Sequence, residues 1–266
     1  MTQPEPILSD DVRAVRTLDV FYGMELGCSS LDLHRSGWTL LPAATECDPM
    51  ALLFGQRPLL HLVTPVARDG ETVTGGVAAV APELRPAVAA LLRGLSPSTL
   101  FTLDNLRTLD ALVRSAASGT VTSLREAHLR IAYMTPSSFC PYIGQWQEWI
   151  EPLDETEETD LTALGLLAHY SGGVYVIRQY GAIAAFSGIR PRSPHVSEVS
   201  VRTEIEALRH HGLGSAVLSR STRAILASGR LPLYRCRAAN MPGWRMAESL
   251  GYRPYADALA YFTVSS

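Results

Sequence analysis

Apolar residues recur along the chain with two spacings, one typical of helices and one typical of strands. In residues 11–24, Val12, Val15, Leu18 and Phe21 follow a helical spacing, and Asp10 is placed to cap the helix. The same spacing predicts helices at 83–93 and 104–117. Short apolar or alternating runs predict strands at 38–41, 58–63, 72–80, 99–102 and 124–134, with residues 51–54 as a buried strand or the end of a short helix. This half of the chain is therefore expected to be mixed α/β.

The second half repeats the alternation of strands and helices. The pattern predicts a helix at 161–170, a hairpin of strands 173–178 and 182–189 around Tyr180-Gly181, and a β-branched strand at 196–203. The remaining predicted elements are a helix at 215–226, a strand at 231–237, a helix following Asn240, and closing strands at 255–264. The whole chain is thus predicted to be α/β with a mixed sheet.

The segment between the strand at 196–203 and the helix at 215–226 is the strongest chemical signal. It reads Arg209-His-His-Gly-Leu-Gly214, so two glycines open a helix and an arginine stands beside them. The N–H groups of a first helical turn have no partner within the helix, and the helix dipole adds positive charge there. Glycine at 212 and 214 lets a ligand approach where a Cβ would collide. Strand, loop and helix together predict a phosphate-binding site.

The spacing of these residues excludes two common nucleotide motifs. It is R-x-x-G-x-G, which is neither G-x-G-x-x-G nor a P-loop, because no Lys-Ser/Thr pair follows the glycines. On this hexapeptide alone, an ordinary strand–turn–helix connection is the simpler reading. The segments that follow this hexapeptide favour the phosphate-binding interpretation instead.

With those segments, residues 160–266 resemble the GNAT superfamily of acyl-CoA-dependent N-acetyltransferases. The matching stretches, in order, are Glu198-Val-Ser-Val-Arg-Thr203, Arg209-His-His-Gly-Leu-Gly214, Tyr234-Arg-Cys236, Asn240 and Ala247-Glu-Ser-Leu-Gly-Tyr252. The resemblance implies a GNAT domain at 161–266, a linker at 146–160 and a smaller α/β domain at 1–145, which has a diverged first GNAT-like domain as one interpretation. It also implies acetyl-CoA as cosubstrate and an amine, small-molecule or peptide, as acceptor.

Three features depart from the pattern of the family. The loop between Thr203 and Arg209 is one residue longer than usual, and residues 241–244 read Met-Pro-Gly-Trp instead of small or hydroxyl residues. Ala247 stands where many relatives carry a tyrosine that serves as general acid. Tyr252 and Tyr255 are close in sequence, but tyrosines at such positions belong more often to a core. A coenzyme A thiolate can leave without much help, so no acid is required.

Glu198 is the candidate catalytic residue. An amine must lose its proton before it attacks a thioester, and a carboxylate on the strand before the phosphate loop can accept that proton, often through water. In a β-branched strand, burial is expected to raise the pKa of this carboxyl group. An ion pair with Arg202 or another arginine, with a structural role only, is an equally weighted alternative.

The resemblance also implies which residues contact the cosubstrate. A backbone N–H near Val199 would polarise the thioester carbonyl, and the strand would bind the pantetheine arm. Asn240 would reach the pantetheine and cap its helix. The expected cofactor-binding set is Val199, Ser200, Val201, Arg209, His210, His211, Gly212, Leu213, Gly214, Ser215 and Asn240.

Composition narrows the class of protein further. The 266 residues carry a net charge of −3 with scattered basic residues, which argues against a nucleic-acid surface. Cys28, Cys47, Cys140 and Cys236 form no C-x-x-C pair, so neither a zinc site nor a redox motif is expected. No apolar run reaches the length of a membrane span and no signal peptide is visible, which predicts a cytoplasmic protein with free thiols. A homodimer is compatible with the sequence.

Two functions from different classes follow. The first is direct acetyl transfer from acetyl-CoA to a primary amine, with transfer of a larger acyl group as a variant. The second is a CoA-binding sensor or interaction module without catalysis, which the alanine at 247 keeps open. Trp146 and Trp149, three residues apart, are expected to pack one half of the chain on the other instead of stacking on a substrate.

Overall fold

The computed structural model describes residues 9–43, 58–67, 73–117, 124–153 and 170–263, and the chain separates into two compact units. Unit 1 contains residues 1–17 and 132–254, and unit 2 contains residues 18–131 and 255–266. The chain passes from one unit to the other within helix α1 (Asp10–Leu26), strand β4 (Leu124–Tyr133) and strand β10 (Arg253–Thr263). The units therefore combine the chain differently from the predicted domains, since residues 132–145 lie in unit 1 and the last residues in unit 2.

Unit 1 is built on a mixed sheet with the strand order β9-β8-β7-β6-β5. Strands β5, β6, β7 and β8 pair antiparallel in that succession, and β8 pairs parallel with β9. The bounds are β5 Glu151–Pro152, β6 Val174–Gln179, β7 Ala182–Pro191, β8 Val196–Thr203 and β9 Leu231–Arg237. The expected hairpin is confirmed, because Tyr180 (φ 56°) and Gly181 (φ 79°) both take the left-handed conformation of a two-residue turn.

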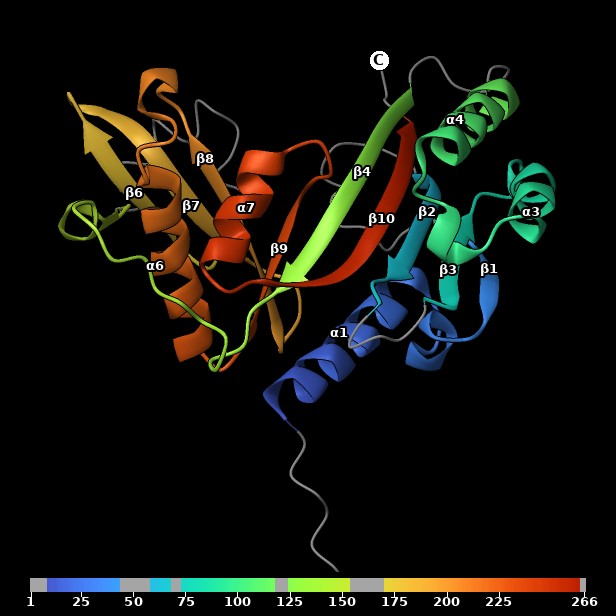
Figure 1. Ribbon diagram of the computed structural model, residues 1–266, viewed down its shortest axis with the longest axis horizontal. Helices are drawn as coiled ribbons and strands as arrows, with labels where there is room; N and C mark the ends of the chain where they lie inside the picture. Colours follow the sequence, from blue (N-terminus) through green and yellow to red (C-terminus); the bar gives the residue numbers. More distant parts are fainter. Residues whose placement is uncertain (1–8, 44–57, 68–72, 118–123, 154–169, 264–266) are drawn as a thin grey trace, which may run out of the picture. The chain divides into compact units, whose positions relative to one another are not determined.

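Helices α6 (Leu213–Ala227) and α7 (Met241–Ser249) cover one face of this sheet (Figure 1). Helix α6 connects the parallel strands β8 and β9, and Gly229 follows its end with φ 74°. The core between helices and strands includes Val199, Leu218, Ile225, Tyr234, Trp244 and Tyr252. Short 3₁₀ helices at Gln147–Trp149 and Glu206–Leu208 complete the unit.

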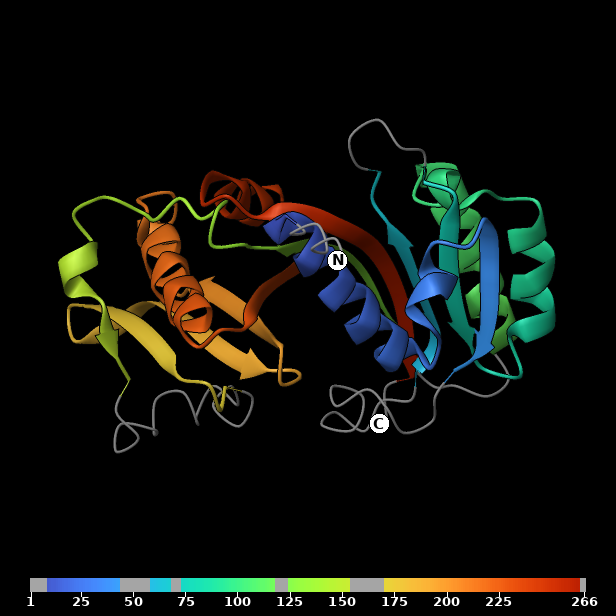
Figure 2. The same cartoon turned by 90° about the horizontal axis from the view of Figure 1, so that it is seen from below.

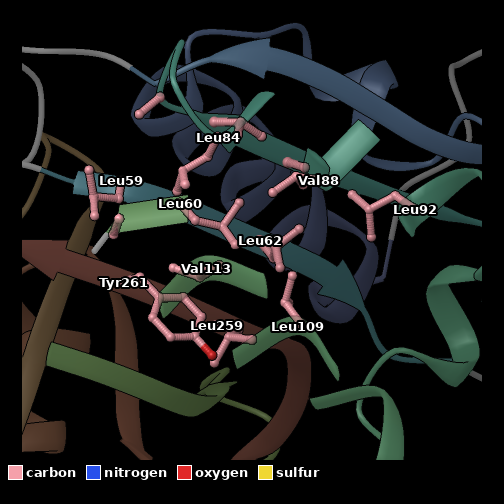
Figure 3. Packing of buried hydrophobic residues seen from close by; sticks show 14 of the residues in the cluster. Leu59, Leu60, Leu62, Leu84, Val88, Leu92, Leu109, Val113, Leu259 and Tyr261 are labelled. Atoms are coloured by element: carbon pink, nitrogen blue, oxygen red, sulfur yellow. The ribbon is translucent and has the colours of Figure 1, made fainter. Parts of the chain in front are cut away.

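Unit 2 also combines helices with parallel and antiparallel strands, and the order of its strands is β1-β3-β2-β10-β4. Strand β1 (Gly37–Pro42) pairs parallel with β3 (Gly75–Val80), while β2 (Pro58–Pro65) pairs antiparallel with β3 and with β10. Helices α3 (Arg85–Arg93) and α4 (Leu103–Ala117) pack on it. Their apolar faces meet the strands in a core of leucines and valines that also holds Leu259 and Tyr261 from β10 (Figure 3).

Most predicted elements are confirmed, and one is wrong. Residues 99–102, expected as a strand, lie at the end of a 3₁₀ helix, Pro97–Thr99, and in the turn that leads to α4. The bond from Leu100 N–H to the Pro97 carbonyl closes that turn, which the short Thr-Leu-Phe-Thr stretch does not reveal by itself. The elements expected at 51–54 and 161–170 lie outside the described residues, apart from Tyr170.

Candidate functional site

The predicted phosphate loop ends at the beginning of α6. Gly212 stands before the helix with φ 86°, and His210 also has a positive φ of 68°. The first bond inside the helix runs from Ala216 N–H to the Gly212 carbonyl (3.0 Å). The N–H groups of Leu213, Gly214 and Ser215 therefore precede the first intrahelical bond and point out of the helix end, as an anion site requires.

Two aromatic residues from the segment before β5 hold this loop in place. The Trp146 indole N–H donates a hydrogen bond to the His211 carbonyl (2.6 Å). A Cβ added to Gly212 would lie 3.0 Å from the Tyr142 hydroxyl oxygen. The expectation for Trp146 is thus corrected, because its indole bonds within unit 1 and its ring packs with Leu213 and Ala216. Trp149 is 59 % exposed.

Strands β8 and β9 separate in front of this loop. Their parallel ladder runs from Val196–Leu231 to Val199–Tyr234, whereas β8 continues to Thr203 with partners on β7. In the described ladder, the end of β8 therefore has no partner on β9, and Figure 1 shows the two strands on either side of α7. A strand edge without a partner offers backbone groups to an extended ligand.

A cavity of about 560 Å³ opens where the strands part and α6 begins. Eight of the eleven predicted cofactor-binding residues line it, namely Val201, Arg209, His210, Gly212, Leu213, Gly214, Ser215 and Asn240. The sequence analysis missed the other lining residues, which are Arg202, Thr203, Leu208, Tyr234, Pro242, Gly243 and Met246. Alternation along β8 and β9 could have placed Thr203 and Tyr234 there, because they share the face of Val199 and Val201.

Three predicted cofactor residues and Glu198 do not line this cavity. Val199 is 1 % exposed and belongs to the core, and His211 contributes its carbonyl to the bond with Trp146. Ser200 lies on the other face of β8, two residues from Glu198. Gly214 lines the cavity, and a Cβ added to it would also lie 3.2 Å from the Met246 sulfur, so glycine here permits close packing of α6 on α7.

The second helix end at the cavity belongs to α7. The Asn240 side chain caps this helix by accepting a hydrogen bond from Gly243 N–H (3.1 Å). The Tyr234 hydroxyl donates a long hydrogen bond to the Gly243 carbonyl (3.4 Å), which keeps the phenol beside the cap. Burial raises the pKa of Tyr234, so this phenol keeps its proton at neutral pH.

Glu198 is held by two arginines. Its carboxylate accepts hydrogen bonds from Arg235 Nε (2.9 Å) and Nη2 (2.6 Å) and from Arg192 Nη1 (2.8 Å). Burial acts to raise its pKa, but the guanidinium groups, above all that of Arg235, lower the pKa of Glu198 from 4.5 to about 2. The expectation of a raised pKa is therefore wrong. Arg202 bonds Glu204 (3.0 Å) instead, so the ion-pair alternative is realised with different arginines.

Neither tyrosine weighed as a general acid is placed for that role at this cavity. The Tyr252 hydroxyl shares a 2.7 Å hydrogen bond with the Thr222 hydroxyl in the core of unit 1, and burial raises its pKa. Tyr255 belongs to unit 2, where its hydroxyl donates to Asp19 (2.8 Å). Ala247 is buried in the core. Among the described residues that line the cavity, Tyr234 is the one that carries a phenol.

Two arginines that line the cavity are in ion pairs. Arg209, 52 % exposed, lies 3.1 Å from the exposed Glu206, and Arg202 pairs with the less exposed Glu204. An exposed ion pair is worth less than about 1 kcal/mol, so a phosphate can replace Glu206 as the partner of Arg209. In the described part of the chain, no group of three His, Cys, Asp or Glu side chains could hold a metal ion. None of the described helices is long and apolar enough to span a bilayer.

Comparisons with known proteins give partial likenesses. No family model and no curated protein matches the sequence. A structure from Novosphingobium aromaticivorans, described as a GNAT-family acetyltransferase, is 26% identical; the match covers 53% of this chain and 66% of that one, with a TM-score of 0.44. A GCN5-related N-acetyltransferase from Kribbella flavida is 16% identical over 82% of this chain and 93% of its own, with a TM-score of 0.43.

A third similar structure was solved with a ligand. It is described as an acetyltransferase from Salmonella typhimurium with its cofactor acetyl-CoA; it is 15% identical over 44% of this chain and 94% of its own, with a TM-score of 0.34. Structures of the GNAT family thus recur among those to which this mixed α/β chain is similar. TM-scores below 0.5 add no weight to a functional assignment, which depends on the residues of the cavity.

Proposed function

We propose that unit 1 is an acetyl-CoA-dependent N-acetyltransferase that transfers the acetyl group directly to a primary amine. The observation that carries the proposal is the meeting of three features at one cavity. These are the exposed N-terminus of α6, the separation of β8 from β9, and the capped N-terminus of α7. A long ligand with a phosphate at one end and an amide-bearing arm matches these features in order.

The residues of the cavity suit the parts of acetyl-CoA. The N–H groups of residues 213–215 and the Arg209 guanidinium suit a pyrophosphate. The open edge of β8 at Val201 suits the amides of the pantetheine arm, and Asn240 lies on the opposite wall. When bound, acetyl-CoA supplies a thioester whose carbonyl carbon is attacked by the nitrogen of the amine.

The same residues suggest how protons are handled. Glu198, with a pKa of about 2, is a weak base, and we assign it to holding Arg192 and Arg235. An acceptor amine would then bind neutral or lose its proton to water. The Tyr234 phenol, which keeps its proton and lies at the cavity wall, is the group we assign to donate a hydrogen bond to the leaving thiolate; the thiolate then takes its proton from solvent.

Calorimetric titration with acetyl-CoA, beside free CoA, tests the proposal. We expect micromolar binding to the wild-type protein and none to Gly212→Glu, because a carboxylate at the helix N-terminus would repel the phosphate groups. Incubation of wild-type protein with acetyl-CoA and a panel of amines should then release free thiol. Absence of acetyl-CoA binding to the wild-type protein would refute the assignment.

The alternative function, a binding module without catalysis, is favoured by two observations. Glu198 is engaged by arginines, and Ala247 offers no acid. Acetyl-CoA binding without release of thiol for any amine of the panel would support this alternative. Release of thiol that depends on an amine would exclude it.

A further inference from the structure

A second, smaller cavity lies in unit 1 beside α6. It has a volume of about 190 Å³ and is formed by the segment that precedes β5 and by the first three turns of the helix. Figure 2 shows this segment running next to α6. The bond from Tyr142 N–H to Ser219 Oγ (3.0 Å) ties the two walls together.

The polar groups of this cavity favour an anion. Arg220 and Arg223 line it, one helical turn apart, and no acidic side chain is among the described residues that line it. Like charges at this spacing repel each other, so a bound anion would relieve a cost that the free protein carries. Within the described part of the chain, neither guanidinium group lies within ion-pair distance of a carboxylate.

The donors around the two arginines are held in place before any ligand binds. The Arg220 guanidinium lies over the Tyr175 ring, 5.0 Å from its centroid, which fixes its plane and leaves its N–H edges available. Ser219 Oγ accepts from the backbone, so its own proton can be donated into the cavity. Guanidinium groups form paired hydrogen bonds with phosphate oxygens, which makes a phosphate monoester the best-matched anion.

The cavity lies close to the phosphate loop. Tyr142 lines the smaller cavity, and the hydroxyl oxygen of this tyrosine would lie 3.0 Å from a Cβ added to Gly212 in the phosphate loop. Arg220 lies seven residues along the helix from Leu213, a rise of about 10 Å at about 1.5 Å per residue. A nucleotide whose pyrophosphate sits on the loop can therefore extend past Tyr142 to the arginines.

We infer that Arg220 and Arg223 form a subsite for the 3′-phosphate of coenzyme A. This inference rests on the proposed function, since it requires the pyrophosphate of the same molecule at the loop. It gives the protein a means to distinguish CoA from nucleotides that lack the 3′-phosphate.

The test compares CoA with dephospho-CoA, which lacks only that phosphate, by calorimetry at low salt. We expect the wild-type protein to bind CoA about tenfold more tightly, as one or two charge-assisted hydrogen bonds would give. Arg220→Gln and Arg223→Gln should weaken CoA binding and leave dephospho-CoA binding unchanged, so that the preference disappears. Arg107→Gln, an exposed arginine of α4 in unit 2, is the charge-matched control and should keep the preference.

Each other outcome overturns the inference in a distinguishable way. Equal binding of the two nucleotides by the wild-type protein, or a preference that survives both substitutions, would place the 3′-phosphate elsewhere and leave the proposed function intact. If the substitutions weakened the binding of CoA and dephospho-CoA equally, the arginines would act only through their positive charge at a distance and would not contact the 3′-phosphate. Inorganic phosphate that binds the wild type and not the variants, without any preference for CoA, would assign the cavity to a separate anion. Failure of both nucleotides to bind would refute the proposed function as well.

Discussion

Replacement of Glu198 by glutamine should destabilise the protein without directly removing a catalytic base. The carboxylate neutralises Arg192, which is 3 % exposed, and Arg235, which is 15 % exposed, and the variant would remove the negative charge that both guanidinium groups contact. A pKa lowered from 4.5 to about 2 is about 2.5 units, which corresponds to about 3 kcal/mol at about 1.36 kcal/mol per unit. Loss of one partner of a buried pair has a cost of the same order. Urea unfolding at pH 7, followed by tryptophan fluorescence, measures the difference.

The sign of the pH dependence follows from the lowered pKa. The folded state binds its proton more weakly than the unfolded state, so the stabilisation by Glu198 is complete above about pH 4.5 and is lost as the pH falls towards about 2. The difference in stability between wild type and Glu198→Gln should therefore shrink as the pH is lowered from 4.5. A series of unfolding curves from pH 7 to pH 3 follows this change.

An exposed glutamate of the same unit is the matched control. Glu151, 53 % exposed, pairs with Arg178 at 3.1 Å, and Glu151→Gln should change the free energy of unfolding by less than about 1 kcal/mol. A Glu198→Gln variant as stable as the wild type, or a deficit that persists unchanged in acid, would contradict the ion-pair reasoning. Unchanged stability together with a large loss of turnover would instead identify Glu198 as the base.

Three further substitutions address the loop and the phenol. Gly212→Ala should weaken acetyl-CoA binding about tenfold in calorimetry, because the left-handed conformation costs about 1–2 kcal/mol; Gly229→Ala carries the same strain with open space around it and should bind normally. Trp146→Phe removes the bond to the loop and should raise the Kd for acetyl-CoA about fivefold, whereas an equal effect of Trp149→Phe would refute the bracing role. Tyr234→Phe should lower kcat about tenfold at unchanged acetyl-CoA affinity; an unaltered kcat would exclude the phenol as a hydrogen-bond donor to the thiolate.

Local pattern was enough to predict the elements that bear the site. The hairpin at Tyr180-Gly181, the β-branched strand β8 and the glycine-opened α6 follow rules that act within a few residues, and the structure confirms them. The loop residues that line the cavity, Arg209, His210 and 212–215, were predicted from the same local rules. Asn240 as the cap of α7 is confirmed for the same reason, because a cap bonds only three residues ahead.

Contacts between distant residues decided what the sequence could not show. The pKa of Glu198 depends on Arg235, which is 37 residues away in the sequence. Alternation along β8 therefore predicted the face of the strand on which Glu198 lies but could not predict the pKa of its carboxyl group. Trp146 reaches a carbonyl 65 residues away, which no helical spacing reveals. The strand expected at 99–102 was wrong because two apolar residues between threonines fit a 3₁₀ turn equally well.

The division of the chain between the units sets the order in which they can form during synthesis. Strand β10 is paired with β2 inside the sheet of unit 2, and Tyr255 at its start stacks on Tyr22 (5.4 Å between ring centroids) and bonds Asp19. These residues emerge from the ribosome after all of β5 to α7 has emerged. Unit 1 can therefore fold before unit 2 does. Most of unit 2 is synthesised first, but its sheet lacks β10 until that strand has emerged.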